Sequence, residues 1–398
     1  MNGLDGERFD VVSPRGKARV GYWEIDGAQH GPYRPSEIVC RGTYEDVLDF
    51  FDARMWTDGL PIVPPTIDRI ERTLSQVDRR PDEILAVVGD EEIEATVWNA
   101  AVNAVMAGCR DQDFPIALEL AGIMADPAFR IRDAGSTTSW EVLVLLSGPD
   151  LPDRGFNTET GVMRMGRRAN TALGRFTRLW IRNIAGLLIP PGFTDMAAIG
   201  QSFHVAMAEN DEGCHAVGWP TCRQEWGFRA DDIVVAAQGI VGASGPIYTS
   251  GGSPESHLRV LGAAIAGCSA HIAGIGASNG QWAPVLAMTP AIAEVFARAG
   301  MTKDDVRHAL GEHALAPARL LVDGAEALGR RRPDFGQLVA DGLLSRAFHE
   351  SDDPDRLVST IPFPEQLAIV VTGNPGRNQS RFYIPLGQPG QRTAKRVG

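Results

Sequence analysis

Residues 168–192 read RANTALGRFTRLWIRNIAGLLIPPG, and this stretch determines how we divide the chain. Apolar residues recur at helical spacing from Arg168 to Leu187, which predicts a long helix. The segment Ile189-Pro190-Pro191-Gly192 then ends it, because proline lacks the amide hydrogen that a helix needs. We therefore expect the boundary between two lobes at this segment.

Helices and strands alternate on both sides of this boundary. Before it, the pattern predicts helices at 44–56, 94–108 and 114–124 and strands at 84–88 and 140–146. After it, we expect strands at 202–207, 233–237 and 367–371, and helices that start at Ser253-Pro254 and Thr289-Pro290, the second ending at Gly300. This mixture predicts an α/β fold with a two-lobed mixed sheet and helix architecture. We assign 1–45 to an N-terminal extension, 46–192 to the first α/β lobe and 193–398 to the second.

The composition is globular and excludes several classes of protein. The chain has 398 residues, 44% of them hydrophobic, and its net charge of -12 argues against a nucleic-acid partner. No apolar run approaches the roughly 18 residues of a spanning helix, and the N-terminus lacks a secretory signal pattern. The five cysteines include no Cys-x-x-Cys pair, which is typical of reduced thiols. We expect a cytoplasmic protein without a membrane span; homo- or hetero-oligomer formation stays open.

Lysine is rare, with Lys17, Lys303 and Lys395 the only three. None of them follows a glycine-rich loop in the P-loop pattern, which excludes a Walker-type nucleotide site. A Schiff-base mechanism would depend on Lys303, but Thr302-Lys303-Asp304-Asp305 has the pattern of a helix start. We therefore assign Lys303 no chemistry.

Arginines gather on the long helix. The 30 residues from Gly161 to Pro190 contain six arginines and no acidic residue, and Arg168, Arg175 and Arg182 share one helical face because they are seven residues apart. Guanidinium groups match carboxylate or phosphate, so Arg168, Asn170 and Arg175 are candidates for binding a small anionic ligand. Alternatively, the arginines pair with carboxylates of the other lobe or of a second subunit.

An acidic segment, Glu209-Asn210-Asp211-Glu212, follows the strand predicted around His204. Glu209 and Glu212 are candidates for general acid or base catalysis. Together with His204, Cys214, His215 and Cys222 the segment offers ligands for a metal, but the spacing matches no standard zinc pattern, and we predict no metal site. A solvated turn that pairs with the arginines is the alternative.

Three further segments carry candidate chemistry. Cys109 follows a predicted helix and is the cysteine that we single out as a nucleophile or redox thiol, with an inert buried thiol as the alternative. Gly276-Ala277-Ser278-Asn279-Gly280 matches the Gly-x-Ser-x-Gly elbow, but the following Val285-Leu286-Ala287-Met288 predicts a strand where an elbow needs a helix. The loop 372–380 offers backbone amides and Arg377 to a ligand, or is a plain hairpin turn.

Four segments of the chain resemble an uncharacterised bacterial family that is related to, or partnered with, the UGSC-type proteins, which bear a selenocysteine or cysteine motif. These segments are Asp58 to Thr66, Asn103 to Cys109, Arg168-Ala169-Asn170-Thr171 with Gly174-Arg175, and Ala208 to Glu212. The resemblance implies an association with thiol or redox chemistry. The chain departs from the family pattern at Ser139 and at Ile292, where the family carries histidines.

These observations lead to one functional expectation. We expect an enzyme that binds a small anionic substrate, bearing carboxylate or phosphate, between its lobes through Arg168, Asn170, Arg175 and Arg377. Thiol-dependent chemistry at Cys109, with Glu209 and Glu212 as acid/base carboxylates, is the expected mechanism, and no cofactor is identified. The alternative is a non-catalytic subunit of a larger enzyme complex.

Overall fold

The computed structural model describes residues 7–19, 34–89, 92–136, 139–188, 199–327, 334–387 and 392–398, and its fold is α/β as predicted. The N-terminal part carries two small antiparallel sheets and five helices. The sheets are β1 (Phe9–Val12) with β3 (Ile38–Gly42), and β2 (Lys17–Ala18) with β5 (Ile93–Thr96) and β4 (Ile84–Val88). The helices are α1 (Tyr44–Ala53), α2 (Ile67–Leu74), α3 (Val97–Ala107), α4 (Phe114–Ala125) and α5 (Arg168–Asn183).

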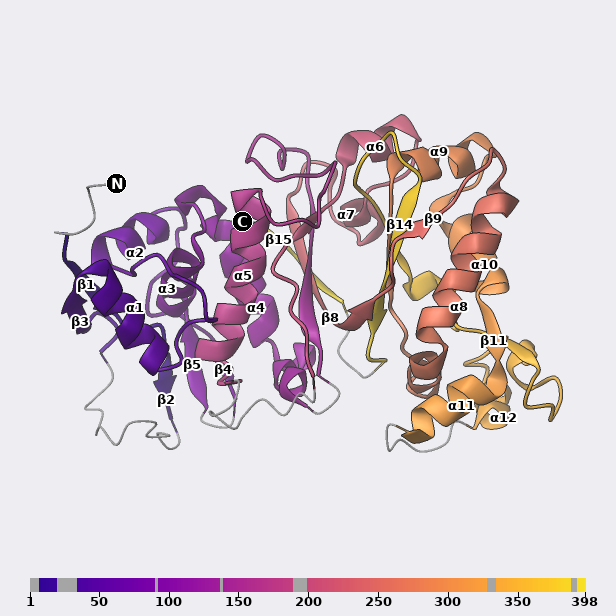
Figure 1. The fold of residues 1–398 in the computed structure, drawn as a ribbon, viewed down its shortest axis with the longest axis horizontal. Helices are drawn as coiled ribbons and strands as arrows, with labels where there is room; N and C mark the ends of the chain where they lie inside the picture. Colours follow the sequence, from indigo (N-terminus) through magenta and orange to yellow (C-terminus); the bar gives the residue numbers. More distant parts are fainter. Residues whose placement is uncertain are drawn as a thin grey trace.

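A larger sheet occupies the middle of the molecule (Figure 1). Its strand order is β13-β10-β14-β8-β6-β7, with β15 on β8 and β9 on β14. The strands are β6 (Glu141–Ser147), β7 (Met207–Ala208), β8 (Val234–Ala243), β9 (Ile247–Tyr248), β10 (Val285–Met288), β13 (Ala368–Val371), β14 (Gln379–Pro385) and β15 (Thr393–Arg396). The pairs β6/β7 and β10/β13 are parallel, and the other pairs are antiparallel.

Further helices cover the side of the sheet away from α3, α4 and α5 (Figure 1). They are α6 (Asp211–Ala216), α7 (Cys222–Glu225), α8 (Pro254–Ser278), α9 (Pro290–Arg298), α10 (Lys303–His313), α11 (Ala318–Ala327) and α12 (Phe335–Ala340), with the short strands β11 (Leu315–Pro317) and β12 (Leu357–Ser359) beside them. Helix α8 is long and apolar enough to cross a membrane, but 61% of its most apolar window is buried. It packs against α10 and α11, so we interpret it as a core helix.

Side chains alternate between separate cores along the strands of the large sheet. On β6, Val142 and Val144 face the core under α3, α4 and α5, whereas Leu143 faces an inner core. On β13, Ile369 faces the core under α8 and α10, whereas Val370 faces the same inner core as Leu143. The two halves of the sheet therefore enclose the inner core, and each half is covered by its own helices.

Most predicted elements lie where the pattern places them, with three corrections. The helix expected from residue 94 begins at Val97, because Thr96 caps it with a capping box and residues 93–96 form β5. The helix expected to reach Leu187 ends at Asn183. The strand expected over 202–207 is reduced to β7, although its polar and apolar residues alternate.

The structure confirms one expectation about the candidate motifs and shows that one alternative is wrong. Ser278 lies in the last turn of α8, and its hydroxyl donates to the carbonyl of Gly274 at 2.9 Å, so the Gly-x-Ser-x-Gly segment is no nucleophile elbow. The loop 372–378 is no hairpin, because β13 and β14 do not pair with each other but flank β10 on its two sides.

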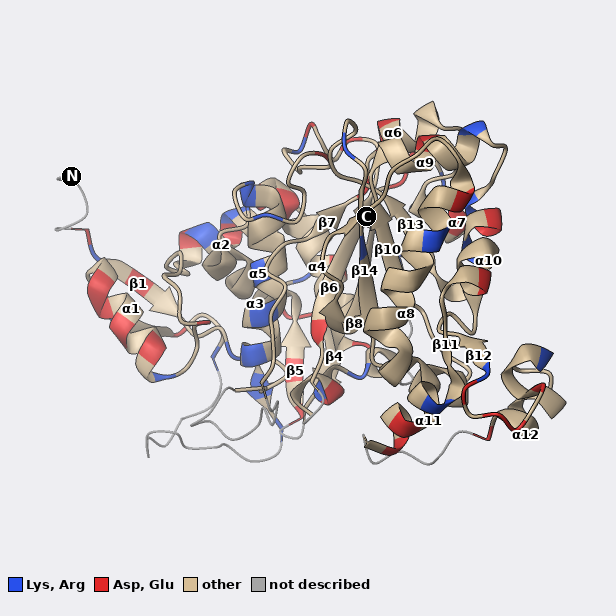
Figure 2. Ribbon diagram, turned by 45° about the vertical axis from the view of Figure 1, so that its right-hand side comes forward, with Lys and Arg blue, Asp and Glu red and all other residues tan. Residues whose placement is uncertain are grey.

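The predicted boundary at 189–192 lies outside the described residues. The two halves of the chain share the large sheet, since β6 pairs with β7 on one side and with β8 on the other. Figure 2 shows basic and acidic residues on both sides of this sheet, with basic segments along α5.

Candidate functional site

The carboxyl ends of the three strands β6, β7 and β13 lie side by side and form one edge of the large sheet. The amide of Glu209, just after β7, donates to the carbonyl of Leu146 near the end of β6 at 2.8 Å. The next amide, of Asn210, donates to the carbonyl of Val371 at the end of β13 at 2.8 Å. The hydroxyl of Thr372 donates to the carbonyl of Ala208 at 2.7 Å. Ligands of α/β proteins bind outside the carboxyl ends of strands, so this edge is the expected place for a site.

A cleft of about 620 Å³ opens at this edge, which is the size of a small-molecule site. The loop after β6 forms one wall, and the segment after β7 forms the other. The lining residues are Gly148, Pro149, Pro152, Gly155, Phe156, Asn157, Thr158, Glu159, Arg167, Glu209, Asn210, Asp211, Glu212 and His215.

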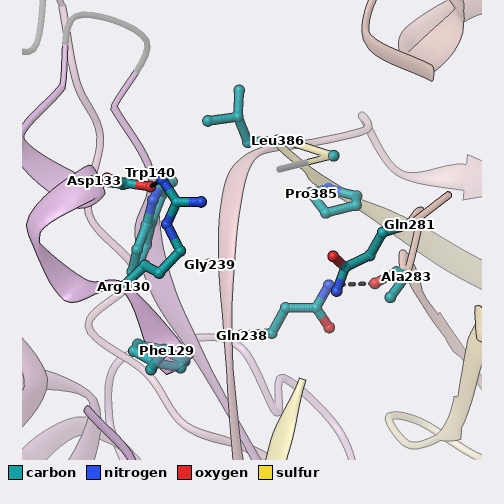
Figure 3. Close-up of a pocket in the computed structure, with 11 residues that line it drawn as sticks. Phe129, Arg130, Asp133, Trp140, Gln238, Gly239, Gln281, Ala283, Pro385 and Leu386 are labelled. Atoms are coloured by element: carbon teal, nitrogen blue, oxygen red, sulfur yellow. Dashed lines mark hydrogen bonds and ion pairs between the residues drawn. The ribbon is translucent and has the colours of Figure 1, made fainter. Parts of the chain in front are cut away.

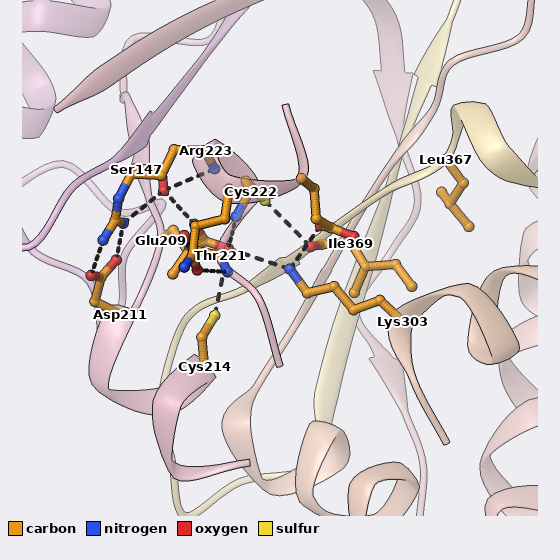
Figure 4. Close-up of polar contacts among 12 residues, drawn as sticks. Ser147, Glu209, Asp211, Cys214, Thr221, Cys222, Arg223, Lys303, Leu367 and Ile369 are labelled. Carbon is orange, nitrogen blue, oxygen red and sulfur yellow. Dashed lines mark hydrogen bonds and ion pairs between the residues drawn. The ribbon is translucent and has the colours of Figure 1, made fainter. Parts of the chain in front are cut away.

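Glu209 lies at the inner end of this cleft and is 1% exposed. One carboxylate oxygen accepts a hydrogen bond from the hydroxyl of Ser147 at 2.6 Å, and the amide of Cys222 donates to both oxygens at 2.8 and 3.0 Å (Figure 4). The ammonium nitrogen of Lys303 lies 3.6 Å from the other oxygen. These contacts hold the carboxylate in one orientation.

Further charged side chains surround the carboxylate of Glu209. The ammonium of Lys303 donates to Glu225 at 3.0 Å, and the guanidinium of Arg307 donates to the same carboxylate at 2.6 Å. Arg223 binds Asp211 with two hydrogen bonds of 2.6 Å and reaches the hydroxyl of Ser147 at 3.1 Å. Burial opposes the charge of Lys303, but the carboxylates of Glu209 and Glu225 help to outweigh burial, and the pKa of the lysine is raised. Lys303 is therefore an ammonium and not an amine nucleophile.

Two buried cysteines lie beside Glu209. The thiol of Cys214 donates to Glu209 at 3.5 Å, and the thiol of Cys222 donates to the carbonyl of Ile369 at 3.4 Å. Burial raises the pKa of both thiols, and the charge of Glu209 raises it further. Both are thus protonated hydrogen-bond donors at neutral pH. Among the described residues no group of three or more His, Cys, Asp or Glu side chains is arranged to hold a metal ion.

Both predicted acid/base residues, Glu209 and Glu212, line the cleft. Glu212 is exposed, lies in the first turn of α6 and makes no ion pair with another described residue. The predicted pairing of this acidic segment with the arginines of α5 is not observed within the described residues. Its partners are Arg223 and Lys303 instead.

Arg175 has a carboxylate partner elsewhere. It binds both oxygens of Asp58 at 2.7 Å and donates to the carbonyl of Leu60 at 3.1 Å. Arg178 lies 3.7 Å from Glu141, in the same half of the chain. Carboxylates of the same predicted lobe thus neutralise Arg175 and Arg178, instead of carboxylates of the other lobe or of a second subunit, and we assign neither arginine to a ligand.

The other predicted binding residues do not line the cleft either. Arg168 donates to the carbonyl of Gly108 at 2.8 Å, and Arg377 is exposed in the turn before β14. Asn170 is fully buried and has a structural role: its amide group bonds the backbone of Asn157 and the carbonyl of Ala206, which fixes one wall of the cleft.

Cys109 follows the C-cap of α3 and does not line the cleft. Burial, together with the charge of Asp113, raises the pKa of its thiol to about 12. At neutral pH the thiolate population of Cys109 is therefore very small, which agrees with the alternative interpretation of this residue as an inert thiol. Ser139 and Ile292, where the resembling family carries histidines, do not line the cleft, and Ile292 is fully buried in the core under α8.

The sequence pattern does not predict a place in the site for Ser147, Arg167, Arg223 or Lys303. Lys303 was discounted because Thr302 begins a helix, and the structure shows that capping box. The same residue nevertheless lies at the first position of α10 and is 2% exposed, and its ammonium faces Glu209 and Glu225. The rarity of lysine, with three in the chain, was the signal in the sequence that could have pointed to Lys303.

A second cavity lies beside the middle of β8, close to the start of β6 (Figure 3). It measures about 30 Å³ and is lined by residues that include Phe129, Trp140, Gln238 and Gln281. Gln238 is already bonded to the carbonyl of Ala283 and to Arg392. This volume holds about one water molecule, so we assign it no ligand.

Comparison of the chain with protein-family models, with curated proteins and with solved structures finds no match. The assignment of function therefore depends on the geometry described above.

Proposed function

We propose that the chain is an enzyme that acts on a small substrate in the cleft between the strand ends, with Glu209 as the acid/base carboxylate. The observation that carries the proposal is the position of Glu209, a preorganised carboxylate at the inner end of a cleft of about 620 Å³. Acid/base groups act efficiently when they are held within reach of a bound substrate and shielded from water.

An anionic group on the substrate is the second part of the proposal. Arg167 lines the cleft, is exposed, and makes no ion pair with another described residue. A guanidinium group in this state is suited to bind carboxylate or phosphate. Arg167 thus takes the role that the sequence pattern suggested for Arg168 and Arg175, and Glu212 is a further carboxylate that lines the cleft.

The surroundings of Cys109 do not support a thiol mechanism, and we leave it out of the proposed reaction. We place the enzyme in the cytoplasm, because all five cysteines are free and a reducing compartment keeps them so.

Turnover by the intact protein tests the proposal. The protein is incubated with small carboxylic acids and phosphate monoesters, and products are detected by proton NMR. Glu209→Gln is expected to lower turnover by about 10²–10⁴-fold, which is the usual contribution of a general acid or base. Glu45→Gln, at an exposed glutamate of α1, is the matched control and leaves turnover unchanged.

Wild-type rates in Glu209→Gln would overturn the role of Glu209. An isolated chain that binds no small anion but copurifies with another protein would favour the alternative of a non-catalytic subunit.

A further inference from the structure

The charges around the cleft divide into two groups. Glu209 and Asp211 are already compensated, by Lys303 at 3.6 Å and by the two hydrogen bonds of Arg223. The remaining charged side chains at the cleft are Glu159, Glu212 and Arg167. All three are exposed, and none makes an ion pair with another residue that the structure describes.

These three side chains carry both signs of charge, and the negative charges outnumber the positive one. Two carboxylates and one guanidinium group give the open part of the cleft a net negative charge. A ligand that fills the cleft removes water from all three groups, and each charge that is left without a partner lowers the affinity. A purely anionic ligand satisfies Arg167 but approaches two carboxylates, whereas a purely cationic ligand leaves Arg167 without a partner.

The uncharged part of the lining indicates what lies between the charged groups of the ligand. Pro149, Pro152 and Phe156 contribute apolar side chains to the wall formed by the loop after β6. A short aliphatic segment suits this surface.

We propose that the substrate of the cleft is a small zwitterion, whose carboxylate or phosphate binds Arg167 and whose ammonium group binds Glu212 and Glu159. This inference depends on the proposed function, and it narrows the substrate from any small anion to an amine that also carries an acid group.

Matched ligands test the inference with the intact protein. Isothermal titration calorimetry at low salt compares a series of ω-amino acids, from glycine to 5-aminopentanoate, each with the acid and the amine of the same chain length. O-phosphoethanolamine is compared with ethyl phosphate and ethylamine, which distinguishes a phosphate from a carboxylate as the acid group. At least one zwitterion is expected to bind about tenfold more tightly than both of its partners.

Variants of exposed residues assign the two ends of the ligand. Arg167→Gln removes the advantage of the zwitterion over the amine, and Glu212→Gln removes its advantage over the acid. Arg164→Gln and Glu45→Gln are the matched controls, because both residues are exposed and neither lines the cleft. Both controls are expected to bind the zwitterion like the wild type.

The outcomes separate this inference from the function on which it depends. An acid that binds as tightly as its zwitterion, with no effect of Glu212→Gln, overturns the zwitterion and leaves the anion-binding enzyme in place. Binding of amines alone, unaffected by Arg167→Gln, overturns both. Absence of binding by every acid and every zwitterion also overturns both.

Discussion

Two of the buried pairs of a carboxylate with a cation that the structure describes differ in their surroundings. Beside α5, Asp58 is held by Arg175, with side chains 2% and 13% exposed. At the strand ends, Glu209 is held by Lys303, with both side chains 1% exposed. Only Glu209 borders the cleft. Burial of an ion pair is thus no sign of a site by itself, and the cleft that Glu209 lines distinguishes the two pairs.

The two carboxylates also differ in their bonds. Both oxygens of Asp58 are bound by one guanidinium group, and although burial acts to raise the pKa of Asp58, Arg175 outweighs burial and lowers it. Glu209 is bound instead by a hydroxyl, a backbone amide and a more distant ammonium. A bidentate pair joins two segments firmly, whereas the contacts of Glu209 hold a carboxylate in one orientation beside the cleft.

Replacement of Lys303 is expected to have the largest effect on stability. Lys303→Met leaves Glu209 buried beside Glu225 without an ammonium between them, and removal of one partner from a buried pair costs about 3–5 kcal/mol. Urea unfolding at neutral pH measures the loss. Lys17→Met is the matched control, since this lysine is half exposed and 4.0 Å from Glu94, and its effect is expected within about 0.5 kcal/mol. If Lys303→Met lowered the free energy of unfolding no more than Lys17→Met does, Lys303 would not stabilise the buried carboxylates of Glu209 and Glu225.

Replacement of Arg175 is expected to have a smaller effect on stability and none on ligand binding. Arg175→Met leaves Asp58 without its bidentate partner, and we expect a loss of about 3 kcal/mol, because Arg175 is partly exposed and water reaches the site. Arg167→Gln is the matched comparison: it leaves stability unchanged and weakens the binding of anions. Loss of ligand binding in Arg175→Met, measured by titration of the folded protein, would contradict the assignment of the Arg175–Asp58 pair to a structural role.

The smallest expected effect is a dependence on pH through His204. Burial lowers the pKa of His204, and Arg175 and Arg178 lower it further against the opposite effect of Asp58. The folded state thus resists protonation, so the stability that neutral His204 contributes is present above about pH 6.5 and is lost as the pH falls through the lower folded pKa. Asp58, whose folded pKa is lowered, loses its contribution only below about pH 4, in a separate window.

The measurement is urea unfolding between pH 7 and pH 5. His204→Asn is expected to lose less stability over this range than the wild type, whereas His271→Asn, at an exposed histidine, behaves like the wild type. Parallel curves for the wild type and His204→Asn would show that His204 is not the group responsible.

Local patterns in the sequence predicted much of the fold. Helices α4, α8 and α9 begin where the sequence places them, because the cap Ser253 and the prolines Pro254 and Pro290 at the first helical positions act on neighbours along the chain. The order of strands in the large sheet had no such local signal. It depends on pairings such as β14 with β8, whose residues lie more than 100 positions apart.

The candidate site was predicted in part for the same reason. The acidic segment 209–212 follows a strand, and its place at a sheet edge could be expected from the sequence. The partners of Glu209 could not be expected, because Ser147, Cys222 and Lys303 come from three distant segments. The positive charge of the arginine-rich helix could be predicted from the sequence. The neutralisation of Arg175 by Asp58 could not, because the two residues lie 117 positions apart.

By itself, the sequence determined the composition, the class of fold, the helix starts and the acidic segment that borders the cleft. Only the tertiary structure decided which charges are compensated within the protein and which stay open to a ligand. The physical reason is that the energy of a charge depends on its burial and on the distance to its partners, and both are set by segments that the chain brings together in space.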